Sequence, residues 1–134
     1  MSFELRDHTA DVAVEATGET LSETFENVAS GFTAVHCESI PADGDRFSIV
    51  VEAESIEALL FDYLDELVYQ RDVRGVLPTE HRVSVDADRI RLEASARGVP
   101  FEKIDAREIK AVTYSEMVVE ETASGWRAYV VFDV

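Results

Sequence analysis

The segment from Trp126 to Val134 constrains the fold more than any other part of the chain. Its side chains alternate between two faces, as in a β-strand, yet both faces are apolar from Ala128 to Phe132. A strand that is apolar on both faces is usually covered on both sides and lies in the centre of a sheet. We therefore predict a buried central strand, with Asp133 and Val134 emerging together at its end.

Two other segments have the periodicity of amphipathic helices. In the first, Thr20 followed by Glu23 predicts a capping box, and apolar residues recur at helical spacing to about His36, forming a stripe that faces a sheet. In the second, Ser55 is a suitable N-cap and Gly75 follows the end. The apolar face of this second helix comprises Ile56, Leu59, Leu60, Tyr63, Leu64, Leu67 and Val68.

Period-two alternation predicts strands elsewhere along the chain. They cover residues 3–5, 12–16, 46–53, 81–86, 89–96, 110–120 and 126–134, with a turn at 86–88. Strands and helices do not alternate strictly, which argues against a doubly wound parallel sheet. We predict one α+β domain over residues 1–134, in which mixed, mostly antiparallel β-sheet layers pack with the two helices.

The charge balance limits the possible partners. The chain of 134 residues has 28 acidic and 12 basic residues, a formal net charge of −16. Nucleic acids and anionic membranes require a positive surface, so we expect no direct binding to either. The acidity suits either a solvated surface in a high-salt cytoplasm or a face for a basic partner. The even spread of acidic residues favours the first, so a halophilic source is a hypothesis, and it predicts stability that rises with salt.

The positions of the cysteine and the histidines limit the kinds of site that the chain can form. The single cysteine, Cys37, excludes an internal disulfide and a multi-cysteine zinc site, and we expect it to be a small buried residue. His36 ends a helix, which indicates a structural role, whereas His81 opens a strand and is expected to be exposed. The first residues contain neither an apolar run nor a basic leader, so we expect a cytoplasmic protein without a membrane span.

The segment Asp7-His8-Thr9-Ala10-Asp11 is the first candidate site. One interpretation is a polar turn, in which Asp and Thr oxygens accept hydrogen bonds from the backbone. The other is a metal-binding corner, with Asp11 as an oxygen ligand. The residue types alone favour the polar turn slightly.

The chain end is the second candidate. Taken alone, Asp133 and Val134 are most simply a polar terminus. If Asp11 approaches them, the carboxylates repel one another unless a cation or a proton neutralises them. Oxygen ligands favour Ca²⁺ or Mg²⁺ over zinc or copper. Lys110 opens a strand and either pairs with these carboxylates, projects toward a partner, or is an ordinary surface lysine.

Four segments, in this order and spacing, resemble the archease family over essentially the whole chain. They are Asp7 to Val12, Leu59 to Leu67, Lys110 to Ser115, and Phe132 to Val134. Archeases activate the GTP-dependent RNA ligase that joins tRNA halves. The resemblance therefore implies a protein that is not itself an enzyme. It would promote ligase guanylylation and multiple turnover, and broaden the ligase's nucleotide use. Its implied partner is the catalytic subunit of the tRNA-splicing ligase.

The resemblance also implies the site residues. A divalent cation, calcium first with magnesium or manganese as alternatives, would be bound by Asp11, Asp133 and Val134. Asp7 and His8 would support these ligands, and Lys110 would be needed for activation of the partner. Two positions depart from the family pattern: Ala13 replaces a common glycine, and Ser115 replaces a histidine of some members.

Two other functions stay open at this point. One is a small divalent-metal-dependent hydrolase that uses Asp7, Asp11 and Asp133, although its only evident base is His8. The sequence contains no phosphate-binding glycine loop, nucleophile elbow or His-Glu-x-x-His motif. The other is a general RNA-processing chaperone. The native metal and the oligomeric state do not follow from the sequence.

Overall fold

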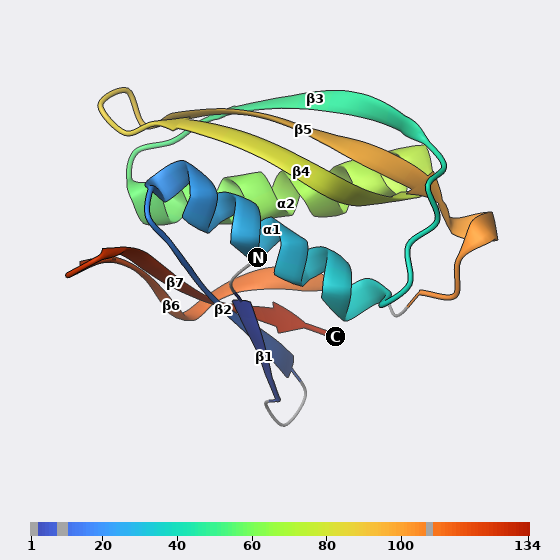
Figure 1. The fold of residues 1–134 in the computed structure, drawn as a ribbon, viewed down its shortest axis with the longest axis horizontal. Coiled ribbons are helices and arrows are strands. Elements are labelled where there is room, and N and C mark those ends of the chain that lie inside the picture. The colour runs from blue at the N-terminus through green and yellow to red at the C-terminus, as the bar shows by residue number, and fades with distance from the viewer. Residues whose placement is uncertain (1–2, 8–10, 107–108) are drawn as a thin grey trace.

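The computed structural model describes residues 3–7 (backbone only for 5–7), 11–106 and 109–134. Two antiparallel sheets enclose a middle layer of two helices (Figure 1). The predicted α+β class, the two helices and the element order are therefore confirmed. The elements are β1 (Phe3–Asp7), β2 (Asp11–Gly18), α1 (Leu21–His36), β3 (Asp45–Glu52), α2 (Ile56–Arg74), β4 (Val76–Asp86), β5 (Arg91–Pro100), a 3-10 turn (Phe101–Lys103), β6 (Ala111–Thr122) and β7 (Gly125–Asp133).

The strand predicted to be central is central. The larger sheet has the order β1-β2-β7-β6, and the smaller sheet has the order β3-β5-β4. Every pairing between described strands is antiparallel. Val130 and Phe132 point to the helices, while Val131 points to the other face, and all three are buried. A closing strand with two apolar faces therefore forms the middle of the larger sheet, as its composition requires.

Both helices begin where their capping residues predict, and α2 also ends where Gly75 predicts. The Thr20 hydroxyl accepts a 3.1 Å hydrogen bond from the Glu23 N–H, and the Ser55 hydroxyl accepts one of 3.1 Å from the Ala58 N–H. Gly75 ends α2 in the left-handed conformation at φ 64°, which glycine adopts without the strain of a side chain.

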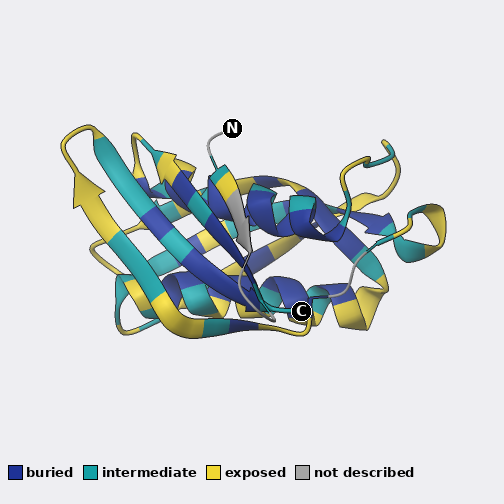
Figure 2. Cartoon of the chain, turned by 90° about the horizontal axis from the view of Figure 1, so that it is seen from below, coloured by how far each residue is buried: buried dark blue, intermediate teal, exposed yellow. Residues whose placement is uncertain are grey.

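The helices are buried more completely than a single apolar stripe predicts, because each packs against both sheets. α1 contacts β2 on one side and β4 on the other. Figure 2 shows the result: buried residues follow the helices and the strands that cross them, and exposed residues gather at the far end of the β6–β7 hairpin. Gly31 permits the close approach of α1, since a Cβ atom there would lie 2.5 Å from Val14 Cγ1.

Two sequence-based expectations about exposure are wrong. His81 is only 5% exposed, because β4 begins at Val76 rather than near residue 81. Its ring packs against α1, where Nε2 lies 2.7 Å from the Thr33 hydroxyl. Cys37, expected to be buried, is partly exposed directly after α1.

Candidate functional site

Residues from the two ends of the chain meet where the inner strands of the larger sheet, β2 and β7, begin and end. Asp11 begins β2 and Asp133 ends β7, and they are direct partners across this antiparallel pair. On its other side Asp133 lies opposite Ala111, and its carbonyl oxygen accepts a 2.7 Å hydrogen bond from the Lys110 N–H. We call Asp11, Lys110, Asp133 and Val134 the tip.

Strand alternation determines where the two tip carboxylates point. Their neighbours Val12 and Phe132 are buried in the core that contains the helices, so Asp11 and Asp133 project from the opposite face of the sheet. Both aspartates are half-buried. Direct partners in an antiparallel pair have Cβ atoms about 4.5–5.5 Å apart. The two carboxylates therefore occupy one small region.

The donor set of the tip suits a hard cation. Within the described residues, neither Asp11 nor Asp133 forms an ion pair with a lysine or arginine. Two like charges at this separation repel, and a divalent cation would remove that repulsion. Oxygen ligands of this type match calcium, magnesium or manganese. The described part of the chain contains no cluster of three His, Cys, Asp or Glu side chains suited to a metal, so an ion here would need an oxygen of Val134 and water as further ligands.

Lys110 belongs to the tip through its backbone, whereas its side chain is exposed. Among the described residues, its ammonium group forms no ion pair with Asp11 or Asp133. Of the roles considered from sequence, this arrangement disfavours neutralisation of the tip and fits either projection toward a partner or an ordinary surface lysine. Two further candidates are not placed: the side chain of Asp7 and the whole of His8 lie outside the described residues, although the Asp7 backbone pairs with Val12.

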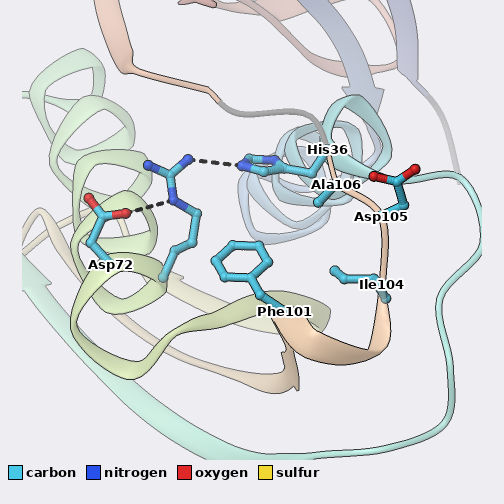
Figure 3. Close-up of a pocket in the computed structure, with 7 residues that line it drawn as sticks. His36, Asp72, Phe101, Ile104, Asp105 and Ala106 are labelled. Atoms are coloured by element: carbon cyan, nitrogen blue, oxygen red, sulfur yellow. Dashed lines mark hydrogen bonds and ion pairs between the residues drawn. The ribbon is translucent and has the colours of Figure 1, made fainter.

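A buried polar cluster next to the tip was not predicted from sequence. It joins His36 at the end of α1 to Arg71 of α2, with 3.0 Å between Arg71 Nη1 and His36 Nε2. Both side chains line a pocket of about 420 Å³, together with Asp72, Phe101 and Asp105. Figure 3 shows His36, Asp72, Phe101 and Asp105 around it. Burial lowers the pKa of His36 to about 4, so its imidazole is neutral. His36 is thus structural, as expected, and it acts through its hydrogen bonds to Phe32 O and Arg71.

The sequence does contain a signal for this cluster. Arg71 continues the apolar face of the second helix, four residues after Leu67 and three after Val68. A charged residue at a core position must have buried partners, because leaving it unpaired costs several kcal/mol, on the order of 3–5. The partners themselves come from segments distant in sequence and could not be read from it.

Fold and site together define a small α+β protein with a paired-carboxylate tip, and comparison with known proteins identifies its family. Residues 3–134 match the model of the Archease protein family (MTH1598/TM1083). The chain is 35% identical to "Protein archease" of Methanosarcina barkeri, over 98% of this chain and 95% of that protein. It is also 35% identical to "Protein archease" of Thermococcus gammatolerans, over 98% of both. The chain belongs to the archease family.

Solved structures agree with this assignment. The solution structure of Methanobacterium thermoautotrophicum protein 1598 matches with a TM-score of 0.80 and 30% identity, over 99% of both chains. A Thermotoga maritima crystal structure, described as an archease and possible chaperone, matches in fold with a TM-score of 0.70 and 24% identity, over 98% of this chain and 96% of that one. In the described part of the chain, neither helix combines the length and apolar character needed to cross a membrane.

Proposed function

We propose that this protein is a non-enzymatic activator of the RNA ligase that joins tRNA halves, and that it acts through the tip. The observation that carries the proposal is the direct pairing of Asp11 with Asp133, beside the backbone of Lys110. These three residues are the ones that the family resemblance associates with ion binding and activation. Family membership supports the choice of partner.

The tip supplies the residues that would hold a divalent cation, calcium first and magnesium or manganese as alternatives. Asp11, Asp133 and an oxygen of Val134 are the proposed ligands. A bound ion would neutralise the carboxylates and provide a positive centre with open positions for groups of the partner. The protein's own contribution is the β2–β7 register, which brings two carboxylates together before any partner arrives.

Charge and exposure suit docking at a ligase active site. A channel that accepts RNA is basic, and a chain of net charge −16 is attracted to it and associates faster than a neutral chain. The exposed Lys110 side chain would then contact an acidic or phosphate group at the channel mouth. In this proposal, docking at the mouth promotes ligase guanylylation and repeated turnover, and widens the nucleotides accepted.

The two alternatives differ in their support. A metal-dependent hydrolase needs a base near the ion. His8, the base considered from sequence, lies outside the described residues, and both described histidines are engaged elsewhere. His36 uses both ring nitrogens, toward Phe32 O and Arg71, and His81 is buried against Thr33. A general RNA-processing chaperone has one specific observation in its favour, the description of the Thermotoga maritima archease as a possible chaperone. A pull-down separates the two functions: an activator should capture the ligase alone, whereas a general chaperone should capture several RNA-processing proteins.

The decisive experiment is RNA ligation by the cognate ligase, in single-turnover and multiple-turnover form, with and without this protein. We expect stimulation by the natural protein and by Asp88→Ala, a control that removes a carboxylate from the exposed turn between β4 and β5. Asp11→Ala and Asp133→Ala should fold and fail to stimulate. Full stimulation by both tip variants would refute the proposal. Hydrolysis by the purified protein that disappears in Asp11→Ala would instead establish the hydrolase.

A further inference from the structure

One peptide group connects the tip to the middle of the molecule. It is the group between Ile109 and Lys110, which precedes β6. Its N–H donates to the Asp133 carbonyl at 2.7 Å, and its C=O accepts a 2.6 Å hydrogen bond from Arg71 Nη1. A peptide group is planar and stiff, so a constraint on the carbonyl also orients the N–H that bonds to Asp133.

Arg71 is itself held from three directions. Its side chain is 5% exposed, and Nε donates to Asp72 Oδ1 at 2.9 Å. Because a guanidinium only donates, His36 Nε2 must accept the hydrogen bond from Nη1, which places the imidazole proton on Nδ1. That Nδ1–H donates to Phe32 O at 2.9 Å. The guanidinium thus joins the end of α1, α2 and the segment that precedes β6. Figure 3 shows two of its partners, His36 and Asp72.

Burying a cation in this way is a poor means of stabilising a core. Desolvation offsets most of the attraction, and apolar residues of similar volume often serve as well or better. A rigid fork of donors is, however, well suited to fixing several acceptors in one geometry. The acceptors that Arg71 fixes include the Ile109 carbonyl, one residue before Lys110 and directly next to the strand that flanks Asp133.

We propose that Arg71 is a positioning residue for the tip. It holds the Ile109–Lys110 peptide group so that Lys110 and Ala111 stay in register with Asp133, and Asp133 stays opposite Asp11. His36 assists by accepting from the same guanidinium nitrogen. This inference rests on the proposed function for its biological meaning, but its physical content is separate: the spacing of the tip oxygens depends on a buried residue of another element.

The test compares Arg71→Met with Arg74→Met, which removes the same charge from an exposed position of the same helix. The first readout is amide hydrogen exchange at Lys110, followed by NMR. In Arg71→Met we expect exchange at Lys110 to be at least about tenfold faster, because its local opening becomes easier. The second readout is calorimetric titration with Ca²⁺, where affinity should fall by about 10- to 100-fold. Arg74→Met should match the natural protein in both.

Two conservative variants keep the test decisive if Arg71→Met does not fold. Arg71→Lys keeps one donor for the Ile109 carbonyl but loses the fork, so its affinity for Ca²⁺ should lie between those of the natural protein and Arg71→Met. His36→Gln keeps an acceptor for Arg71 and should bind Ca²⁺ almost normally. Natural affinity and natural Lys110 exchange in a folded Arg71→Lys or Arg71→Met would overturn the inference.

The outcomes also separate this inference from the proposed function. If Asp11→Ala and Asp133→Ala lose ligase stimulation while folded Arg71→Met behaves as Arg74→Met, the activator role stands and the positioning role is wrong. If Arg71→Met loses Ca²⁺ affinity while Asp11→Ala and Asp133→Ala stimulate the ligase fully, Arg71 positions the tip but the tip does not activate the ligase.

Discussion

Carboxylates at the two ends of the β2–β7 pair have opposite electrostatic surroundings. At one end, Glu15 accepts two hydrogen bonds from Arg127, from Nε at 2.8 Å and Nη2 at 2.5 Å, and Glu120 accepts one from Nη1 at 3.1 Å. At the other end, Asp11 and Asp133 face each other, and the described residues provide neither with an ion-pair partner.

Both ends lie on the same face of the same two strands. Glu15 is four residues after Asp11 in β2, and Arg127 is six residues before Asp133 in β7, so alternation turns all four side chains away from the helices. The difference is therefore not one of strand geometry. The chain supplies its own cation beside Glu15, whereas the described residues place none in an ion pair with the tip carboxylates.

The largest expected effect comes from making the tip resemble the Arg127 end. Asp11→Lys places a cation opposite Asp133, which removes one proposed ligand and neutralises the other. We expect Ca²⁺ binding and ligase stimulation to be lost, while the ion-free protein melts at or above the natural temperature because repulsion is relieved. Calorimetric titration, ligation assays and thermal melts measure these outcomes, with Asp88→Lys as control. A variant that still stimulates the ligase would show that the contrast between the two ends has no functional meaning.

The loss of stability at acid pH tests the two buried histidines separately from both ends of the β2–β7 pair. Burial lowers the pKa of His36 to about 4 and that of His81 to about 3, whereas unfolded histidine titrates near 6.5. The unfolded chain therefore binds more protons in this window, so stability is full above about pH 6.5 and falls toward pH 4, by on the order of 3 kcal/mol for each histidine.

Chemical denaturation at a series of pH values measures this loss. His81→Gln, whose amide can still donate to Thr33, should reduce the slope between pH 6 and 5 by about one proton. An unchanged slope would mean that His81 does not titrate with unfolding, and that carboxylates at the sheet ends dominate acid sensitivity even above their ordinary range.

The smallest effect is expected at the end that is already neutralised. Arg127→Met leaves Glu15 and Glu120 without this partner, and because all three groups are partly exposed to water the cost should be about 1 kcal/mol. Ca²⁺ affinity and ligase stimulation should not change. Denaturant titration measures the loss of stability, and calorimetric titration and ligation assays measure Ca²⁺ affinity and ligase stimulation. Lost Ca²⁺ binding would mean that the two ends are coupled along the strands.

Much of the fold was predictable because local signals agreed with the tertiary structure. Thr20, Ser55 and Gly75 fix the helix limits through hydrogen bonds and backbone conformation that depend on a few neighbours. The two apolar faces from Ala128 to Phe132 required a central strand. The separation into two sheets around the helices was not predictable, since period-two alternation does not say which strands pair.

The residues of the site were predictable from the sequence, but the strand pairing and the buried contacts that hold them in place were not. Asp11 and Asp133 were selected from strand ends and from family resemblance, but their pairing depends on the β2–β7 register, to which every residue of both strands contributes. His81 was misjudged because β4 begins at Val76, so His81 lies inside the strand and not at its exposed start. Arg71 was missed because its partners, His36 and the Ile109 carbonyl, are 35 and 38 residues away in sequence.

Calorimetric titration of Ca²⁺ into the natural protein and into Asp11→Ala, Asp133→Ala and Arg127→Met tests the central claim most directly. The account predicts one ion for each chain, bound by the natural protein and by Arg127→Met, with no measurable binding by either tip variant. Equal binding by all four proteins, or loss of binding in Arg127→Met alone, would contradict it.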